Sequence, residues 1–224
     1  MYPARDAAGA LGLARAELGA GPRRFTSTAF ATFTAFVNGL RDSGASPDGT
    51  KLPFATGFDP ATGISDQYVY DTTTATIATI QPQQRSLLCN YNFLLSSVPT
   101  SETLNPFTAD SRWFLSAYEV DPDTLLRTMA AIDARGVRRF SDARGFACAP
   151  TTGARVVFND HTDAALTAAD LRIIDLAAPG AATLIRAQAH PSFVVSRDGR
   201  RVVLASGPGD PAAQQGLYVY AVPR

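Results

Sequence analysis

A unit of constant length recurs four times along this chain of 224 residues. Each unit opens with a four-residue turn signal rich in Ser, Thr, Pro, Asp and Gly, and it closes at the end of a second β-type run. The fourth turn residue and the last residue of that run are 22 positions apart in every unit: Gly49 and Asp71, Ser111 and Asp133, Gly153 and Asp175, and Gly199 and Ala221. Such a spacing predicts a repeat architecture, in which each unit buries its faces against its neighbours.

The residue types within the units predict β-hairpins. Turns such as Pro47-Asp48-Gly49 and Arg197-Asp198-Gly199 offer a glycine where the backbone needs a positive φ. The flanking runs are short, apolar and rich in Val, Ile, Tyr, Phe and Trp, which favours strands with both faces covered. The first runs cover 51–54, 113–115, 155–158 and 201–204, and the second runs cover 67–71, 129–133, 171–175 and 217–221.

Further strands on each side complete about four strands per unit. Candidates before the turns are 103–107, 144–148 and 191–195, and candidate outer strands are 76–80, 136–140 and 182–186. Four antiparallel strands are the content of one β-propeller blade. We therefore expect an all-β chain of about four blades, as a compact ring, as an open arc completed by a partner, or as part of a longer gene product.

The two ends of the chain set the expected domain boundaries. Residues 1–23 are interpreted as an N-terminal extension, either poorly ordered or a short helix that its glycines weaken. Residues 24–224 form the propeller domain, beginning with a strand over 25–34. The last unit stops before an outer strand, so one hypothesis is that residues 25–34 pair with the strand containing 217–220 and close the ring; the open and truncated forms are preferred to the closed ring.

Two of the units carry a family resemblance. Ser46–Leu52 with Gln67–Asp71, and Ser192–Leu204 with Leu217–Tyr220, resemble the repeat of TolB-like β-propellers, a WD-like family. The turns at 108–111 and 150–153 depart from that pattern, since the first lacks Pro and Gly and the second lacks Asp. The resemblance covers roughly residues 40–224 and implies a propeller. It also implies a periplasmic or extracytoplasmic location, although the first residues lack the features of a signal peptide.

Composition excludes several classes of partner. The chain has 20 basic and 20 acidic residues, which argues against a nucleic-acid surface and against a polybasic membrane patch. No run of 18 apolar residues is present, so no membrane span is expected. Lys51 is the only lysine beside many Arg, Ala, Gly and Pro residues, a usage typical of a GC-rich bacterial genome.

Motifs for catalysis or cofactor binding are not found in the sequence. There is no Gly-x-Ser-x-Gly elbow, and the Gly-rich segment 206–210 lacks the Gly-Lys-Ser/Thr of a phosphate loop. Asp71, Asp133 and Asp175 recur with the units and are interpreted as turn residues. The densest set of metal-type ligands lies at 159–163, where Asp160, His161 and Asp163 form a weak metal candidate that a solvated loop explains better. We therefore expect no catalytic residues and no cofactor.

Three features are open to two interpretations. Cys89 and Cys148 are interpreted as unrelated buried thiols, and the alternative is a disulfide formed in an oxidising compartment. The insertion 81–101 is interpreted as an elongated strand pair, with a partner-contact loop as the alternative. The aromatic residues of the repeats, among them Trp113, Tyr70 and Tyr220, are interpreted as blade core and not as a sugar-stacking platform.

The function that these observations favour is a non-catalytic propeller module that binds or scaffolds a protein or peptide partner through its loops. The alternative is the propeller part of a prolyl-oligopeptidase-like serine hydrolase whose catalytic domain lies outside this chain. A stand-alone propeller enzyme with a metal in a central channel is a third hypothesis. A homo-oligomer that closes an open ring is a further candidate partner.

Overall fold

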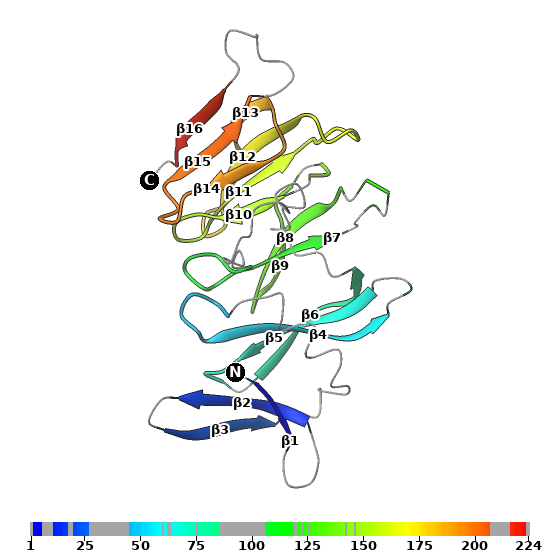
Figure 1. Ribbon diagram of the computed structural model, residues 1–224, viewed down its shortest axis with the longest axis vertical. Helices are drawn as coiled ribbons and strands as arrows, with labels where there is room; N and C mark the ends of the chain where they lie inside the picture. Colours follow the sequence, from blue (N-terminus) through cyan, green and yellow to red (C-terminus); the bar gives the residue numbers. More distant parts are fainter. Residues whose placement is uncertain are drawn as a thin grey trace. The chain divides into compact units, whose positions relative to one another are not determined.

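The computed structural model describes residues 2–5, 11–17, 20–26, 45–59, 61, 64–74, 76–85, 106–118, 121, 123–124, 126–141, 143–145, 147–206 and 216–222. All the regular elements in these residues are strands, and they form five separate antiparallel sheets (Figure 1). No helix that could cross a membrane is found in this part of the chain. The predicted all-β fold is confirmed.

The sheets follow one another along the chain, each made of successive strands. The first two contain β1 (Tyr2–Arg5), β2 (Leu11–Glu17) and β3 (Ala20–Thr26), then β4 (Lys51–Asp59), β5 (Ile64–Asp71) and β6 (Thr76–Arg85). The third contains β7 (Phe114–Tyr118), β8 (Thr128–Asp133) and β9 (Gly136–Arg139). The fourth contains β10 (Cys148–Pro150), β11 (Arg155–Asp160), β12 (Ala169–Asp175) and β13 (Thr183–Ala189). The fifth contains β14 (Phe193–Val195), β15 (Arg201–Ala205) and β16 (Leu217–Ala221).

The chain divides into two compact units. The N-terminal unit comprises residues 1–44 and 50–86, and the C-terminal unit comprises residues 45–49 and 87–224. The first two sheets belong to the N-terminal unit, and the other three belong to the C-terminal unit.

The predicted spacing of 22 residues matches the strands. β5, β8, β12 and β16 end at Asp71, Asp133, Asp175 and Ala221. The fourth turn residue has a positive φ in every unit: 69° at Gly49, 62° at Ser111, 63° at Gly153 and 68° at Gly199. The amide of that residue also donates to the carbonyl of the first turn residue at 46–49, 108–111 and 196–199, whereas the turn at 150–153 is closed by hydrogen bonds of Arg155 with Thr151 and Thr152. Ser111 adopts this conformation without being glycine, and its hydroxyl accepts a hydrogen bond from the Asp48 amide at 2.9 Å.

The aspartates that end the second runs are turn residues, as predicted. One carboxylate oxygen of Asp71, Asp133 and Asp175 accepts a hydrogen bond from the amide two residues later, at 2.8, 2.8 and 2.9 Å. This local bond satisfies a backbone donor where the chain leaves the sheet. Their recurrence follows from the turn geometry that the repeats share.

The N-terminal part differs from its expected structure. The segment considered for a loose extension or a short helix contains strands β1 and β2, which pair antiparallel from Tyr2↔Ala14 to Arg5↔Leu11. Phe25 and Thr26 belong to β3 and pair with Leu13 and Gly12 of β2. The predicted pairing with the last sheet is therefore wrong for Phe25 and Thr26, because β3 belongs to the β1–β3 sheet and the last sheet contains only β14, β15 and β16. Residues 27–34 lie outside the described residues.

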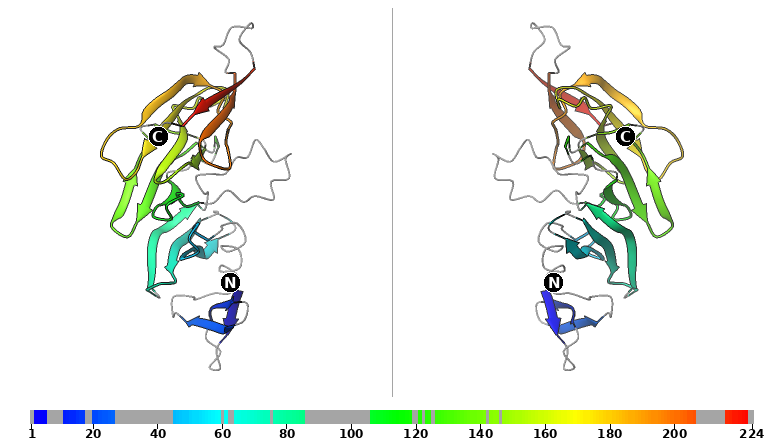
Figure 2. Two further views of the ribbon diagram at one scale, coloured as in Figure 1. Left: turned by 90° about the vertical axis from the view of Figure 1, so that its left-hand side faces the viewer. Right: turned by 90° about the vertical axis from the view of Figure 1, so that its right-hand side faces the viewer.

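Two apolar clusters join the three sheets of the C-terminal unit. One lies between the β7–β9 sheet and the β10–β13 sheet, and it includes Trp113, Leu115, Met129, Val156 and Phe158. The other lies between the β10–β13 sheet and the β14–β16 sheet. It includes Val157, Leu171, Ile173, Phe193, Val202 and Leu204, with Tyr218 and Tyr220 packed against it. The β10–β13 sheet thus lies between its two neighbours, face to face (Figure 2). Trp113 and Tyr70 are buried core residues, as predicted, whereas Tyr218 and Tyr220 are half-buried at the edge of the second cluster.

The pairing state of Cys148 corrects the preferred interpretation of the cysteines. Cys148 is 1% exposed within the first apolar cluster, and it is disulfide-bonded. Cys89 is the only other cysteine in the sequence, and it lies outside the described residues. The interpretation of Cys148 as an unpaired buried thiol is wrong.

Of the insertion at 81–101, residues 81–85 continue β6, and the rest lies outside the described residues.

Arg138 on β9 holds the neighbouring turn between β12 and β13. Its guanidinium donates hydrogen bonds to the carbonyls of Leu176 at 2.7 Å, Ala178 at 2.9 Å and Gly180 at 3.1 Å. The third sheet of the chain is thereby attached to the fourth at a point outside the apolar cluster.

Replacing Arg138 by methionine should lower the free energy of unfolding by about 1.5–3 kcal/mol, because three carbonyls lose a charged donor. Arg138→Lys should recover part of the loss, since an ammonium cannot reproduce the planar fork. Urea denaturation measures both, with Arg135→Met as the control on the exposed β8–β9 turn. Equal stability of the Arg138→Met and Arg135→Met proteins would contradict this role.

The turn glycines Gly153 and Gly199 offer a matched comparison. Both have a positive φ, but a Cβ at Gly153 meets open space, whereas one at Gly199 would lie 2.8 Å from the Thr151 carbonyl carbon. Gly153→Ala should cost about 1–2 kcal/mol from the left-handed conformation alone. Gly199→Ala should cost about 1–3 kcal/mol more, because the turns must separate. Equal midpoints of thermal unfolding for the two variants would show that the β14–β15 turn is not in close contact with the β10–β11 turn.

Candidate functional site

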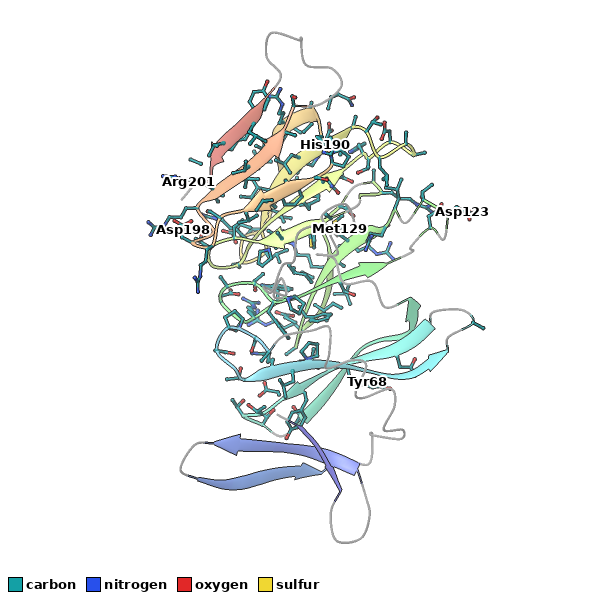
Figure 3. The ribbon with its side chains drawn as sticks, viewed as in Figure 1. Tyr68, Asp123, Met129, His190, Asp198 and Arg201 are labelled. Atoms are coloured by element: carbon teal, nitrogen blue, oxygen red, sulfur yellow. The ribbon has the colours of Figure 1, made fainter. Side chains whose placement is uncertain are left out.

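The strands of the C-terminal unit connect at two ends. Tight turns join β8 to β9, β10 to β11 and β14 to β15 at one of them, the turn end. The connections from β9 to β10, from β11 to β12 and from β13 to β14 lie at the other, the loop end; the first two contain eight residues each and the third contains three. In Figure 3, His190 lies just before β14 and Asp198 just after it, so these residues mark the loop end and the turn end. Binding residues are commonly found on loops that a rigid scaffold positions.

At the loop end of β11 and β12, two carboxylates lie close to an arginine guanidinium and a histidine imidazole. Asp160 and Asp170 are directly opposite each other in the strand register. Arg172 lies near both, with Nε 3.9 Å from the Asp160 carboxylate and Nη2 3.6 Å from that of Asp170. His161 Nδ1 lies 3.6 Å from the Asp160 carboxylate and 3.9 Å from the Asp170 carboxylate.

The Arg172 guanidinium offsets the repulsion between the facing carboxylates. Like charges directly opposite each other destabilise a strand pair, and Asp160 is fully buried, which makes an uncompensated charge costly. Asp160 also accepts a hydrogen bond from the Ala143 amide of the β9–β10 connection at 2.9 Å. The cluster is thus an internal ionic network that also fixes a neighbouring loop.

Asp163, the third residue of the weak metal candidate, has a separate role. Its carboxylate accepts hydrogen bonds from the Thr167 hydroxyl and from the amides of Thr167 and Ala168. The bond from the Thr167 hydroxyl, with help from the two amides, lowers the pKa of Asp163. Among the residues that the structure describes, no group of three or more His, Cys, Asp or Glu side chains is arranged to hold a metal ion.

Asn159 ties two connections of the loop end together. It is 1% exposed, its side-chain oxygen accepts from the Ala147 amide at 2.8 Å, and its nitrogen donates to the Pro191 carbonyl at 2.6 Å. Ala147 precedes β10, and Pro191 precedes β14. The buried side-chain amide of Asn159 therefore fixes the distance between the segments that lead into β10 and β14, the first strands of two adjacent sheets.

The β9–β10 connection is anchored a second time at Gly145. Its amide and carbonyl exchange hydrogen bonds of 2.9 Å with Arg127, just before β8. A Cβ at this position would overlap the Asn159 carbonyl oxygen and lie 2.7 Å from the Met129 Cε. Only glycine lets the connection pass so close to β11.

Arg127 is the functional-site neighbour that sequence reasoning missed. It is 1% exposed, and burial lowers the pKa of its guanidinium to about 10. Nothing in the surrounding Leu125-Leu126-Arg127-Thr128 indicates a buried cation, since arginines at strand ends are usually exposed. Its burial could not be read from the local sequence.

The loop end also carries exposed polar side chains near Asn159, Asp160 and Gly145. Arg144 is 52% exposed at its side chain and pairs with Asp121 at 2.9 Å, while His161 is 47% exposed. Hydrogen bonds from the Thr124 and Asp123 amides lower the pKa of Asp121, so its carboxylate stays ionised beside Arg144. The loop end therefore presents both signs of charge on fixed backbone.

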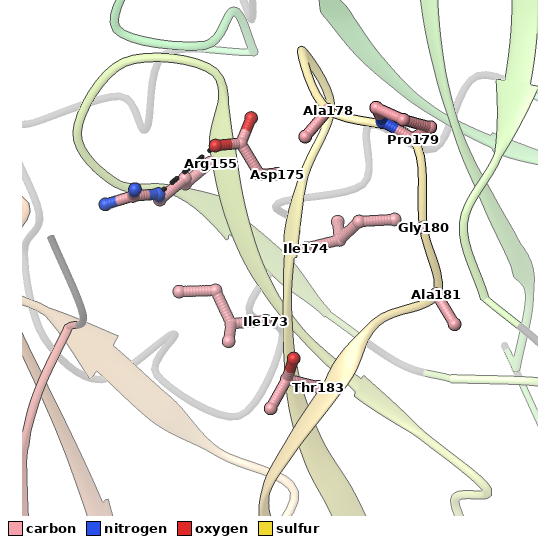
Figure 4. Close-up of a pocket in the computed structure, with 9 residues that line it drawn as sticks. All are labelled: Arg155, Ile173, Ile174, Asp175, Ala178, Pro179, Gly180, Ala181 and Thr183. Carbon is pink, nitrogen blue, oxygen red and sulfur yellow. Dashed lines mark ion pairs between the residues drawn. The ribbon is translucent and has the colours of Figure 1, made fainter.

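A hollow of about 270 Å³ lies at the turn end beside β12. It is lined by Arg155, Ile173, Ile174, Asp175, Thr183 and the 178–181 segment (Figure 4). Arg155 and Asp175 pair across its rim at 3.4 Å. Ligand pockets usually enclose about 300–1,000 Å³, and the polar groups here already bond to each other. The loop end is accordingly the better candidate.

Comparisons with known proteins bear on the fold. No family model matches the chain, and no curated protein matches it. Among solved structures, the chain is similar to the β-propeller domain of the Trilobed protease from Pyrococcus furiosus, which was described with an open velcro topology. The identity is 18%, the coverage is 98% of this chain and 64% of that one, and the TM-score is 0.51.

Two further solved structures are more distant. TolB from Acinetobacter baumannii is 16% identical, with 98% and 52% of the two chains covered and a TM-score of 0.45. The acylaminoacyl peptidase of Pyrococcus horikoshii is 14% identical, with 94% and 36% covered and a TM-score of 0.47. The chain spans less than two thirds of the length of each of these structures. Its repeated antiparallel sheets and its likeness to the Trilobed protease domain show that the fold is that of a β-propeller.

Proposed function

We propose that the chain is a non-catalytic binding module that takes a protein or peptide partner at the loop end of the C-terminal unit. The observation that carries the proposal is the double anchoring of these loops by buried polar groups. Asn159 joins the connections before β10 and β14, and Asp160 holds the Ala143 amide of the first of these connections.

Anchoring of this kind favours binding. A loop that is already held in its bound conformation loses little conformational entropy when the partner arrives. The exposed Arg144 and His161 side chains offer a guanidinium and an imidazole at the surface of these loops. The less exposed Asp160, Asp170 and Arg172 interact with one another. A partner would therefore contact the exposed residues.

The test is a selection against the intact chain with a display library of random 12-residue peptides. Enriched peptides are then synthesised and titrated by biolayer interferometry against the wild type, Arg144→Glu and His161→Asn. Asparagine is chosen because His161 has a φ of 50°, a region that Asn tolerates. Arg197→Glu is the control, since it reverses an exposed charge at the turn end.

The expected result is a set of peptides whose affinity falls at least tenfold for Arg144→Glu and is unchanged for Arg197→Glu. Selection without enrichment, or binders that are indifferent to both loop variants, would overturn the proposal. A circular dichroism spectrum of each variant shows that the fold is retained.

The alternative function is the propeller part of a prolyl-oligopeptidase-like serine hydrolase. It is supported only by fold, since the similar Trilobed protease domain belongs by its name to a protease. In that case the catalytic serine, histidine and acid lie outside this chain. A serine-reactive fluorophosphonate probe that labels the full gene product in its host, outside residues 1–224, would favour this alternative over a binding module.

We further propose that the protein is bacterial and lies in the periplasm or outside the cytoplasm. The disulfide at Cys148 supports that location, because disulfides persist in oxidising compartments. The balanced formal charge supports a partner other than nucleic acid. Thiol trapping with a maleimide reagent, applied to the denatured protein taken from its host, should find no reactive cysteine; two reactive thiols would contradict an oxidising location.

A further inference from the structure

The aspartate that closes a unit pairs with an arginine of its own sheet. In the β7–β9 sheet, Nε and Nη2 of Arg112 donate hydrogen bonds of 3.1 and 3.0 Å to one carboxylate oxygen of Asp133. In the β10–β13 sheet, Arg155 lies directly opposite Asp175 in the strand register, and its Nε is 3.4 Å from the carboxylate. Each carboxylate is therefore supplied within the sheet and not by the sheet next to it.

The two arginines occupy successive positions of the repeat. Arg112 follows the fourth turn residue directly, and Arg155 comes one position later in its unit. An arginine thus reaches the closing residue from either position. The Arg155 side chain is 26% exposed although apolar clusters cover both faces of its sheet. This end of a sheet therefore stays accessible whether or not another sheet covers its faces.

The β14–β16 sheet has an arginine at both positions and no carboxylate to close the unit. Arg200 and Arg201 directly follow Gly199, and the closing residue is Ala221. Arg201 lies opposite Ala221 in the strand register. Both arginines are exposed, and within the described part of the chain neither forms an ion pair with a carboxylate.

The turn itself uses the carboxylate of Asp198, which lies with Arg201 at the turn end of this sheet (Figure 3). One oxygen of Asp198 accepts hydrogen bonds from the Ser196 hydroxyl at 2.6 Å and from the Arg200 amide at 3.1 Å. These two bonds, with the charges of Arg200 and Arg201 adding to them, lower the pKa of Asp198. Residues 197–201 contain three arginines and one aspartate, so this end of the sheet keeps a net positive charge.

We propose that Arg200 and Arg201 bind an acidic peptide segment of a partner protein, with an aspartate or glutamate side chain of the partner placed beside Ala221. The corresponding place in the two preceding sheets holds an aspartate carboxylate, so a side-chain carboxylate is the group that fits. Guanidinium groups bind carboxylates through paired, charged hydrogen bonds. A bound carboxylate also offsets the repulsion between two adjacent guanidinium groups. This site at the turn end is separate from the peptide site proposed at the loop end.

NMR of the intact, ¹⁵N-labelled chain tests the site through the Nε–Hε signals of its arginines. The probe is an eight-residue peptide of alternating Asp and Glu with both termini blocked, and the control peptide has Asn and Gln in their place. The Arg200 and Arg201 signals should shift with the acidic peptide alone, with a dissociation constant of about 1 mM, since exposed ion pairs are weak. Arg201→Gln should weaken this binding about fivefold. Arg197→Gln, in the same turn, should leave it unchanged.

Ala221→Asp is the most direct test, because it restores the closing carboxylate of the other units. A carboxylate held opposite Arg201 has a high effective concentration and should weaken peptide binding by about fivefold or more. Ala221→Asn has nearly the same shape without the charge and should bind as the wild type does. A circular dichroism spectrum of each variant shows that the fold is retained.

Three results would overturn the acidic-peptide site: arginine signals that do not move, equal binding of the two peptides, or an Ala221→Asp protein that binds like the wild type. Inorganic phosphate that binds more tightly than the acidic peptide would indicate a site for phosphate groups and would also overturn it. Arg144→Glu should leave the binding at Arg200 and Arg201 unchanged, so the turn-end and loop-end sites are tested separately.

Discussion

Substitution of Gly145 by alanine is expected to destabilise the protein by about 3 kcal/mol or more. The added Cβ would overlap the Asn159 carbonyl oxygen on β11, which cannot move without breaking the sheet. The β9–β10 connection must shift instead, and this breaks the paired hydrogen bonds of 2.9 Å between Gly145 and Arg127. In a chain of this size the midpoint of thermal unfolding should fall by roughly 6–12 °C.

Gly216→Ala is the matched control for this variant. Neither glycine has a positive φ, so the comparison isolates the space available to the methyl group, and a Cβ at Gly216 has no neighbour within 4 Å. Its effect should stay within about 0.5 kcal/mol. Equal thermal midpoints for the two variants would show that the connection does not pass as close to β11 as described. Gly145→Ala should also weaken peptide binding at temperatures where the protein is still folded, because the Arg144 loop is displaced.

Removal of the disulfide at Cys148 should cost about 4 kcal/mol. The sequence has one other cysteine, Cys89, so the bond would close a loop of 59 residues, and closing a loop of that length restricts the unfolded chain strongly. Cys148→Ala leaves the side chain apolar within the core cluster, which limits other losses. Denaturation in guanidinium, with and without a reductant, measures the change.

The second cysteine provides the control. Cys89→Ala and the double variant should be destabilised to the same extent as Cys148→Ala, because each removes the same single bond. Reductant should lower the stability of the wild type and leave all three variants unchanged. A Cys89→Ala protein that unfolds like the wild type would show that Cys148 does not pair with Cys89.

The repeat could be predicted from the sequence because hairpins are formed by residues that are close together along the chain. A turn that needs a positive φ, two runs of β-forming residues and a closing aspartate all lie within 22 residues, so the strand ends at Asp71, Asp133 and Asp175 could be placed. The N-terminal strands were harder to predict. Their glycine-rich sequence has little local preference, and the pairing of β1 and β3 with β2 decides their conformation.

The candidate site could be predicted only in part. The sequence placed Asp160, His161 and Asp163 close together along the chain, but it could not show that Asp163 closes its own turn while Asp160 faces Asp170 and Arg172. Those partners come from the next strand, ten or more residues away. Burial of Arg127 and the close approach at Gly145 likewise depend on sheets that meet through space.

The sequence by itself determined the β-type units, their turns and their common length, since these follow from the φ preferences and side-chain shapes of adjacent residues. The tertiary structure alone decided which carboxylates are compensated and which loop is pinned to β11. Such properties depend on the packing of one sheet against another, because burial and charge pairing are set by residues that are distant along the chain.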